Sequence, residues 1–280
     1  MYMKNKAAFL LIVLCAASLF FLSDEKSLPA MAEEEGIIDL PVLMYHQVLD
    51  KPQKLGKYVI SPHELEADLQ LIRELGYETV TVGELIAYCN GERGLPKKPI
   101  MLTFDDGYQT DYKNVFPLLR QYNMKGVFSI VGAYTERYST EGIDKHINYA
   151  HLCWDEILEM QKSGHCEFLN HSYNLHSLDG RHGCLKASNE SDLHYRTVIH
   201  DDIAYSQKLL EEKLGKAPPA FTYPYGGTDD ELRSLIREEG FAASLGTYEE
   251  INRISGNTEE LYDIRRFNRA HGRDIRKIIG

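Results

Sequence analysis

From about residue 37 onward, short apolar runs alternate with amphipathic stretches. The apolar runs predict strands at 41–46, 77–82, 100–104, 126–131, 166–169, 221–223, 241–245 and 261–267. The amphipathic stretches predict helices at about 61–76, 110–122, 154–163, 198–214 and 228–240. Such alternation predicts an α/β fold with a mainly parallel sheet. About seven units over this length fit a barrel better than an open sheet, although periodicity does not separate the two.

Two of the predicted helices begin with a capping box. Ser61 is followed three residues later by Glu64, with Pro62 at the first helical position. Thr228 and Glu231 have the same spacing before the helix that ends at Gly240.

The N-terminal segment has a different pattern, typical of export. Lys4 and Lys6 precede the apolar run 7–22, and Ala30-Met31-Ala32 resembles a signal-peptide cleavage site. We interpret 1–32 as a signal peptide or an N-terminal membrane anchor, favouring cleavage, and 33–37 as a linker. Residues 38–280 form the folded domain. Both alternatives place it outside the cytoplasm, secreted or tethered to the membrane only through the N-terminal segment.

Composition excludes some partners. The 280-residue chain carries a formal net charge of −11, which argues against a generic nucleic-acid binder because such proteins need a positive field. A negative charge does not argue against a neutral sugar polymer as the partner. We expect the protein to be a monomer.

Four cysteines lie beyond the export segment, at 89, 153, 166 and 184. Either Cys166 and Cys184 form a disulfide or all four are free thiols.

Candidate chemistry follows the ends of several predicted strands. Asp105 and Asp106 come directly after the strand at 100–104, and His171 and His176 follow the strand at 166–169. His46 ends the first strand. Active sites of parallel α/β folds gather at the carboxyl ends of the strands. We therefore expect these side chains to lie together at that end of the sheet, which we call the mouth of the barrel.

Two imidazoles and a carboxylate form a familiar divalent-metal site with open positions. A five-residue spacing places His171 and His176 about 140° apart on a helix, so both can bind one ion only from a loop. Other interpretations stay open. Asp105-Asp106-Gly107 is also a common turn sequence. His200, Asp201 and Asp202 form a rival cluster, which we expect on the solvated face of a helix.

Four motifs, in this order, resemble those of a known family. They are Pro41-Val42-Leu43-Met44-Tyr45-His46, Thr103-Phe104-Asp105-Asp106-Gly107, His171-Ser172-Tyr173-Asn174-Leu175-His176 and Phe221-Thr222-Tyr223-Pro224-Tyr225-Gly226. Together they resemble the polysaccharide deacetylases of carbohydrate esterase family 4, the NodB-homology domain. The first motif and the spacing of the histidines look like the poly-N-acetylglucosamine deacetylase branch. The resemblance covers about residues 38–279.

The resemblance implies a distorted (β/α) barrel and a metal-dependent hydrolase. Its substrate would be an N-acetylglucosamine-containing polysaccharide of a cell wall or exopolysaccharide, from which it releases acetate. Asp105 would be the general base, and Asp106, His171 and His176 would hold one divalent ion, Zn²⁺. Substrate contacts would come from His46, Tyr223, Pro224, Tyr225 and Gly226. For the last four, a tight loop without a ligand is an equally good interpretation of the residues alone.

The chain departs from the family pattern in two places. The family motif that Phe221–Gly226 resembles often begins with an arginine that orients the base, but residues 218–221 contain none. The general acid of many members is a histidine near the C-terminus, where only His271 is a candidate and its surroundings match poorly. A non-catalytic carbohydrate-binding wall or matrix protein that retains the metal pocket is therefore the alternative. The intact Asp105 argues against it.

Overall fold

The computed structural model describes residues 36–141 and 143–280. The predicted signal peptide or anchor and most of the predicted linker lie outside these residues. The chain divides into two units at residue 36, and the second, Ile37–Gly280, is compact. The helices and strands of the described chain all lie in the second unit, and none of these helices is long and apolar enough to cross a membrane.

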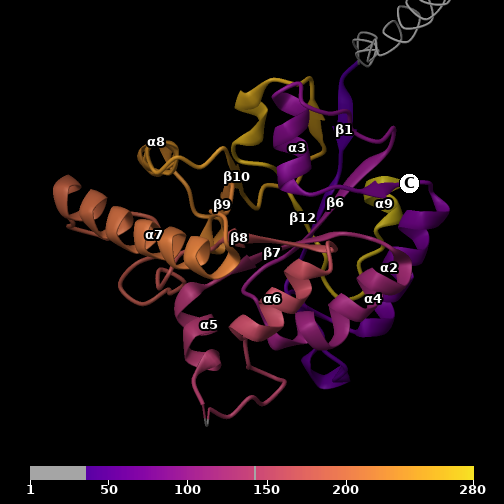
Figure 1. Ribbon diagram of the computed structural model, residues 1–280, viewed down its shortest axis with the longest axis horizontal. Coiled ribbons are helices and arrows are strands. Elements are labelled where there is room, and N and C mark those ends of the chain that lie inside the picture. The colour runs from indigo at the N-terminus through magenta and orange to yellow at the C-terminus, as the bar shows by residue number, and fades with distance from the viewer. Residues whose placement is uncertain (1–35, 142) are drawn as a thin grey trace, which may run out of the picture. The chain divides into compact units, whose positions relative to one another are not determined.

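The core of the second unit is a curled sheet of parallel strands (Figure 1). Seven strands follow one another in the order β10-β9-β8-β7-β6-β2-β12, and β5 pairs with β6 in addition. Their bounds are β2 Val42–Tyr45, β5 Glu78–Thr79, β6 Pro99–Phe104, β7 Gly126–Ile130, β8 Cys166–Asn170, β9 Ala220–Thr222, β10 Ala243–Leu245 and β12 Phe267–Asn268. A parallel bridge between Leu245 and Ile264 links β10 to the segment before β12. The predicted distorted barrel with about seven parallel strands is confirmed.

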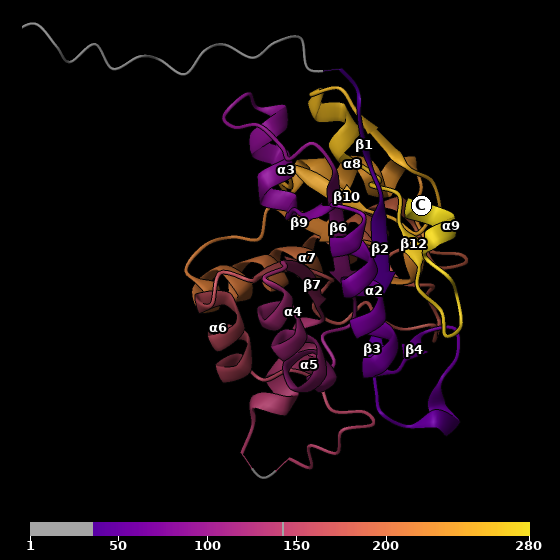
Figure 2. The same cartoon turned by 90° about the vertical axis from the view of Figure 1, so that its right-hand side faces the viewer.

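Helices cover the outside of this sheet (Figures 1 and 2). They are α2 Pro62–Glu74, α3 Val82–Cys89, α4 Phe116–Tyr122, α5 Gly132–Ser139, α6 Trp154–Lys162, α7 Asp192–Leu214, α8 Asp230–Glu238 and α9 Arg276–Ile279. Two small pairs complete the strands: β1 Ile38–Leu40 with β11 Asn252–Ile254, and β3 Gln47–Val48 with β4 Val59–Ile60. All six residues of β6 are buried, as expected for a central parallel strand.

Aromatic rings on three neighbouring strands, β2, β6 and β7, form a stack beneath the carboxyl ends of β2 and β6. The ring of Phe104 lies 5.0 Å from that of Tyr45 and 4.9 Å from that of Phe128, between centroids. Tyr45 precedes His46 and Phe104 precedes Asp105 in the chain. The stack therefore fixes the point at which two functional strand ends leave the core.

Several element boundaries differ from the sequence prediction. The predicted strand at 77–82 shortens to β5, because Thr81 and Glu84 form a capping box that starts α3 at Val82. The predicted strand at 261–267 is wrong: a 3₁₀ turn ends at Leu261, and β12 begins only at Phe267. The helix expected at 110–122 is a π turn, Asp111–Val115, followed by α4.

Two helix starts also differ. Ser191 caps α7, which begins six residues before the predicted Val198. Asp229, rather than Thr228, caps α8 by accepting a hydrogen bond from the amide of Leu232. The predicted capping box of Ser61 and Glu64 is confirmed. The four cysteines beyond the export segment are free thiols in the described chain, so the disulfide alternative does not describe this structure.

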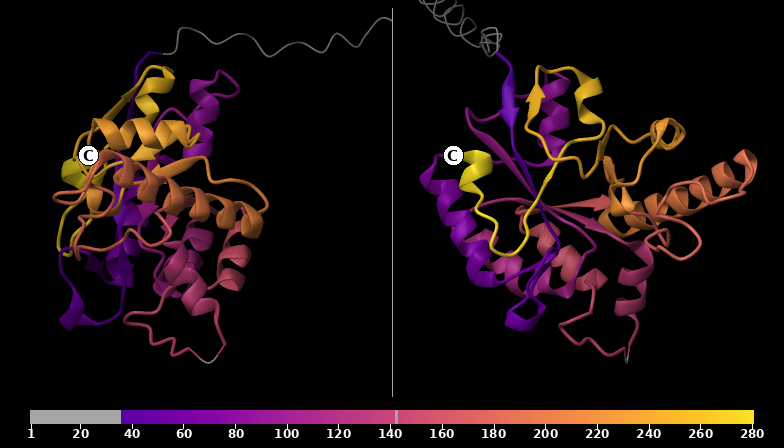
Figure 3. Two further views of the ribbon diagram at one scale, coloured as in Figure 1. Left: turned by 90° about the vertical axis from the view of Figure 1, so that its left-hand side faces the viewer. Right: turned by 180° about the vertical axis from the view of Figure 1, so that it is seen from behind.

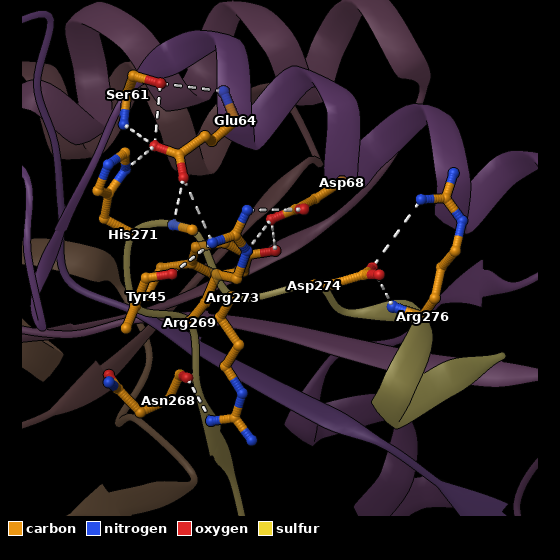
Figure 4. Close-up of polar contacts among 12 residues, drawn as sticks. Tyr45, Ser61, Glu64, Asp68, Asn268, Arg269, His271, Arg273, Asp274 and Arg276 are labelled. Carbon is orange, nitrogen blue, oxygen red and sulfur yellow. Dashed lines mark hydrogen bonds and ion pairs between the residues drawn. The ribbon is translucent and has the colours of Figure 1, made fainter.

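The C-terminal segment returns to α2 and packs against it. Figure 3 shows α9 beside α2, where Ile275 and Ile279 join the same core cluster as Leu69. Figure 4 shows the polar part of this contact. Nε and Nη2 of Arg269 donate to the two carboxylate oxygens of Asp68, at 2.7 and 3.2 Å, and the hydroxyl of Tyr45 donates to Asp68 at 3.1 Å.

The buried pair of Arg269 and Asp68 should contribute strongly to stability. Replacing Arg269 with Ala leaves the carboxylate of Asp68 buried without its cation, which typically costs about 3–5 kcal/mol. We expect Arg269→Ala to lower the free energy of unfolding by that amount in urea titrations. Arg253, whose side chain is 71% exposed beside Asp39, offers a matched control. Arg253→Ala should cost at most about 1 kcal/mol. Equal losses in the two variants would contradict the assignment.

Candidate metal centre and active site

Asp105 and Asp106 follow β6, and their neighbouring carboxylates point to different partners. Asp106 has a φ of +72° and Gly107 a φ of +64°, so the chain turns sharply after Asp105. A Cβ atom at Gly107 would lie 2.8 Å from Cγ2 of Ile130, which excludes larger residues. The turn keeps Asp105 at the strand end and directs Asp106 toward the loop after β8.

Asp105 forms a buried bidentate ion pair with Arg266. Nη1 and Nη2 of Arg266 donate to the two carboxylate oxygens at 2.7 and 2.8 Å. Arg266 is 0% exposed, and its Nε donates to the carbonyl of Gly246 at 2.7 Å. Burial opposes ionisation of Asp105, but the guanidinium prevails and holds the pKa of this carboxyl below its usual value. Asp105 is therefore an ionised carboxylate at neutral pH.

Sequence reasoning missed Arg266. The family resemblance directed attention to residues 218–221, where no arginine stands, whereas the structure provides one from the segment before β12. Arg265 and Arg266 lie within the predicted strand at 261–267, and Arg265 is exposed and pairs with Glu250. No spacing rule distinguishes the two arginines, because only the closure of the barrel brings one of them to β6.

Asp106 lies against both histidines of the loop after β8. Its Oδ1 is 3.0 Å from Nε2 of His176 and 3.5 Å from Nε2 of His171. One ligand atom from each of the three residues lies within 4.8 Å of the others. Nδ1 of His171 is 2.8 Å from the carbonyl of Thr222, which requires a proton on Nδ1 and directs Nε2 toward Asp106.

The electrostatics of these three residues fit a divalent cation. Burial disfavours the charged form of Asp106, yet hydrogen bonds with His171 and His176 hold its pKa well below the usual value. Burial lowers the pKa of His176, and the hydrogen bond with Asp106 outweighs it, so the net shift is upward. A carboxylate that attracts protons onto neighbouring imidazoles attracts a metal ion in the same way. One carboxylate and two imidazoles are also a donor set that suits Zn²⁺.

His46 follows β2 and lies close enough to both aspartates to respond to their charge. Burial lowers its pKa, and the charges of Asp106 and Asp105 partly oppose that shift. Its Nδ1 is buried and has no hydrogen-bond partner among the described residues. The ring packs against Tyr58, with 4.7 Å between centroids. His46 thus brings a neutral imidazole to the two carboxylates.

The loop after β9 divides its residues between the core and the mouth. Tyr223 is buried, and its hydroxyl donates to Ser244 at 3.2 Å, so its ring is not available to a ligand. Tyr225 has a φ of +59° and is 41% exposed, and its ring lies 4.5 Å from that of His176 between centroids, tilted by 31°. Pro224 is buried. A Cβ atom at Gly226 would lie 2.0 Å from Oγ1 of Thr247, so this loop requires glycine.

The structure does not bring His271 to the two aspartates. Its Nδ1 is 2.9 Å from Oε2 of Glu64 at the start of α2, as Figure 4 shows. Partial burial opposes ionisation of Glu64, but the amides of Gly272 and Ser61 and the ring of His271 lower its pKa to about 2. His271 therefore contributes to the attachment of the C-terminal segment.

The rival cluster on α7 does not form a second site. His200 is exposed and pairs with Glu239, and Asp201 is exposed. Asp202 was expected on the solvated face and is instead partly buried, where it accepts hydrogen bonds from the amides of Tyr173 and Asn174.

Comparison with known proteins agrees with this arrangement. A family model described as polysaccharide deacetylase matches residues 92–244, more than half of the chain. Two curated relatives are named poly-β-1,6-N-acetyl-D-glucosamine N-deacetylase. The protein of Escherichia coli K12 is 25% identical over 229 residues, which cover 73% of this chain and 34% of that protein. The protein of Staphylococcus aureus MSSA476 is 23% identical over 212 residues, which cover 75% and 68%. The chain thus spans about a third of the E. coli relative.

Two solved structures share the fold. A de-N-acetylase from Aggregatibacter actinomycetemcomitans is 26% identical with a TM-score of 0.74, covering 86% of this chain and 98% of that one. IcaB from Ammonifex degensii is 28% identical with a TM-score of 0.68, covering 82% and 91%. Sequence motifs, barrel and family model lead to the same conclusion: this chain belongs to the polysaccharide deacetylase family.

Proposed function

We propose that the protein is a metal-dependent hydrolase that removes N-acetyl groups from an N-acetylglucosamine polymer and releases acetate. One observation carries the proposal: Asp105 and Asp106 are adjacent in the chain, yet one pairs with Arg266 and the other with two histidines. A base and a metal ligand need such a separation. The names of the curated relatives support poly-β-1,6-N-acetyl-D-glucosamine as the polymer.

Asp106, His171 and His176 would hold the metal ion, and their donor set favours Zn²⁺. When bound, a divalent ion would polarise the acetamide carbonyl and lower the pKa of a water molecule in the site. Asp105 would accept a proton from the water that attacks the carbonyl carbon. The backbone N–H of Tyr225 would donate to the developing oxyanion. As the C–N bond breaks, the amine needs a proton, and acetate and the free amine leave.

We propose that His46 passes a proton to the departing amine: its imidazole, neutral at rest, would take up the proton that Asp105 accepts from the water and give it to the amine nitrogen. His46 follows β2 at the mouth, beside the aspartates, whereas His271 is engaged with Glu64. Because Nδ1 is buried and the ring packs against Tyr58, the exchange with a ligand would use Nε2 of His46.

The non-catalytic alternative loses one of its supports. The absence of an arginine from residues 218–221 had favoured a binder, but Arg266 supplies a guanidinium to Asp105 from another element. A protein that only binds sugar does not need a buried carboxylate held ionised next to a separate metal-ligand set.

Asparagine substitutions of the two aspartates should fail in different ways. Asp105→Asn keeps the shape and leaves the three proposed ligands intact, so zinc should stay bound at one ion per chain. Loss of the base should lower acetate release by roughly 10²–10⁴-fold. Asp106→Asn weakens the metal site, so zinc content and acetate release should both fall, and added zinc should restore part of the activity.

The measurements are elemental analysis and acetate release from poly-β-1,6-N-acetyl-D-glucosamine, with and without a chelator. Melting curves of each variant show whether it is folded. Loss of zinc from Asp105→Asn with retention in Asp106→Asn would reverse the two roles. A zinc-loaded parent that releases no acetate from any N-acetylated glycan would refute the enzyme.

A matched pair of histidine substitutions tests the proton donor. His46→Ala should lower kcat by roughly 10²–10⁴-fold with unchanged zinc content. His271→Ala removes a partly exposed contact with Glu64, so kcat should stay close to the parental value. The opposite result, with full activity in His46→Ala and a large loss in His271→Ala, would assign the acid to His271.

We also propose that residues 1–32 direct export of the catalytic domain, 38–280, so that it meets its polymer outside the cytoplasm. Lys4, Lys6 and the apolar run 7–22 support this. Fractionation of cells with N-terminal sequencing should find the domain outside the cytoplasm, either cleaved after Ala32 or retained in membranes. An intact protein confined to the cytoplasm would contradict export.

A further inference from the structure

The two histidines of the candidate metal centre lie in one loop whose backbone is held from outside the centre. Four residues, 172–175, separate His171 from His176. The loop folds back on itself, with Ser172 at a φ of +72°. Because a non-glycine residue in this conformation is strained, neighbouring contacts must maintain it.

Helix α7 supplies the strongest of these contacts. Oδ1 of Asp202 accepts a hydrogen bond from the amide of Tyr173, and Oδ2 accepts one from the amide of Asn174, both at 2.8 Å. Hydrogen bonds from amides to an ionised carboxylate are stronger than neutral ones. Each oxygen of Asp202 is therefore engaged by one amide of the loop backbone.

The same helix fixes the beginning of the loop. Oγ of Ser206, one turn after Asp202, donates to Oδ1 of Asn170 at 2.9 Å, and this oxygen also accepts from the amide of Ser172 at 2.9 Å. On the other side, the amides of Gly132 and Ala133 at the start of α5 donate to the carbonyls of Ser172 and Tyr173.

We propose that Asp202 is a positioning residue for the metal centre: by binding two consecutive amides between His171 and His176, it sets the spacing and direction of the two imidazoles toward Asp106. The two rings lie 5.0 Å apart between centroids, and both reach the same oxygen of Asp106. A loop without these two hydrogen bonds keeps only its other anchors, so more of its ordering accompanies metal binding, and that cost weakens binding. The proposal rests on the metal site of the proposed function.

Asp202→Asn is the sharpest variant. An amide offers one acceptor oxygen, and its NH₂ group would face the second backbone N–H, so one of the two hydrogen bonds is lost. Asp201→Asn is the matched control, because it removes the same charge one position earlier on α7 from an exposed side chain. A general electrostatic effect of charge on the metal would appear in both variants.

The measurement is zinc affinity, by titrating metal-free protein in competition with a chromogenic chelator. Asp202→Asn should weaken zinc binding about 10–100-fold, the usual effect of losing a residue that orients metal ligands, with one ion still bound at saturation. Asp201→Asn should match the parent. Equal affinities in Asp202→Asn and the parent would overturn the clamp, as would equal losses in the two variants. A parent that binds no zinc would instead refute the metal site.

A second measurement needs no variant. In the metal-free parent, the amides of Tyr173 and Asn174 should be protected from hydrogen exchange, because Asp202 binds both before any metal arrives. Exchange of both amides at unprotected rates would show that the metal orders the loop, and the proposal would fail even if Asp202→Asn did not fold.

Discussion

Two carboxylates adjacent in the chain and both buried repel each other, and the structure of the active mouth is arranged around that repulsion. The left-handed turn at Asp106 separates them, and each then meets its own partner: a guanidinium for Asp105 and a pair of imidazoles for Asp106. If both faced the same cation, neither could act independently. Gly107 permits this turn, and the side chain of Ile130 packs so closely against Gly107 that no larger residue fits there.

The partners of the two aspartates come from different parts of the barrel. Arg266 reaches Asp105 only because the segment before β12 returns beside β10 and β2 and closes the sheet. Asp106 meets its histidines because β7 places β8 in register two strands away from β6. The C-terminal attachment to α2, through Arg269 and the Glu64 carboxylate, therefore supports the chemistry at a distance by holding the segment that carries Arg266.

Much of this could be predicted from sequence, because the pattern of buried parallel strands is strong and polar residues at their ends stand out. The strand before Asp105, the loop with His171 and His176, and the capping box at Ser61 were all visible in this way. Arg266 could not be predicted as a site residue, because β12 has only two residues and the sequence around it has no clear periodicity. Asp202 was misplaced for a related reason: a charged residue on an amphipathic helix faces solvent unless a loop covers it, and the sequence does not show which loop does so.

The distance along the chain between Asp105 and Arg266 also has a consequence during synthesis. Arg266 lies 161 residues after Asp105. At the usual speed of bacterial or eukaryotic synthesis, about 5–20 residues per second, the two aspartates emerge on the order of 10–30 s before the guanidinium that orients the first of them. Until then the nascent chain holds the motifs of the site without the closed barrel that orders them. The ion pair between Asp105 and Arg266 can therefore form only after the last elements of the domain have been synthesised.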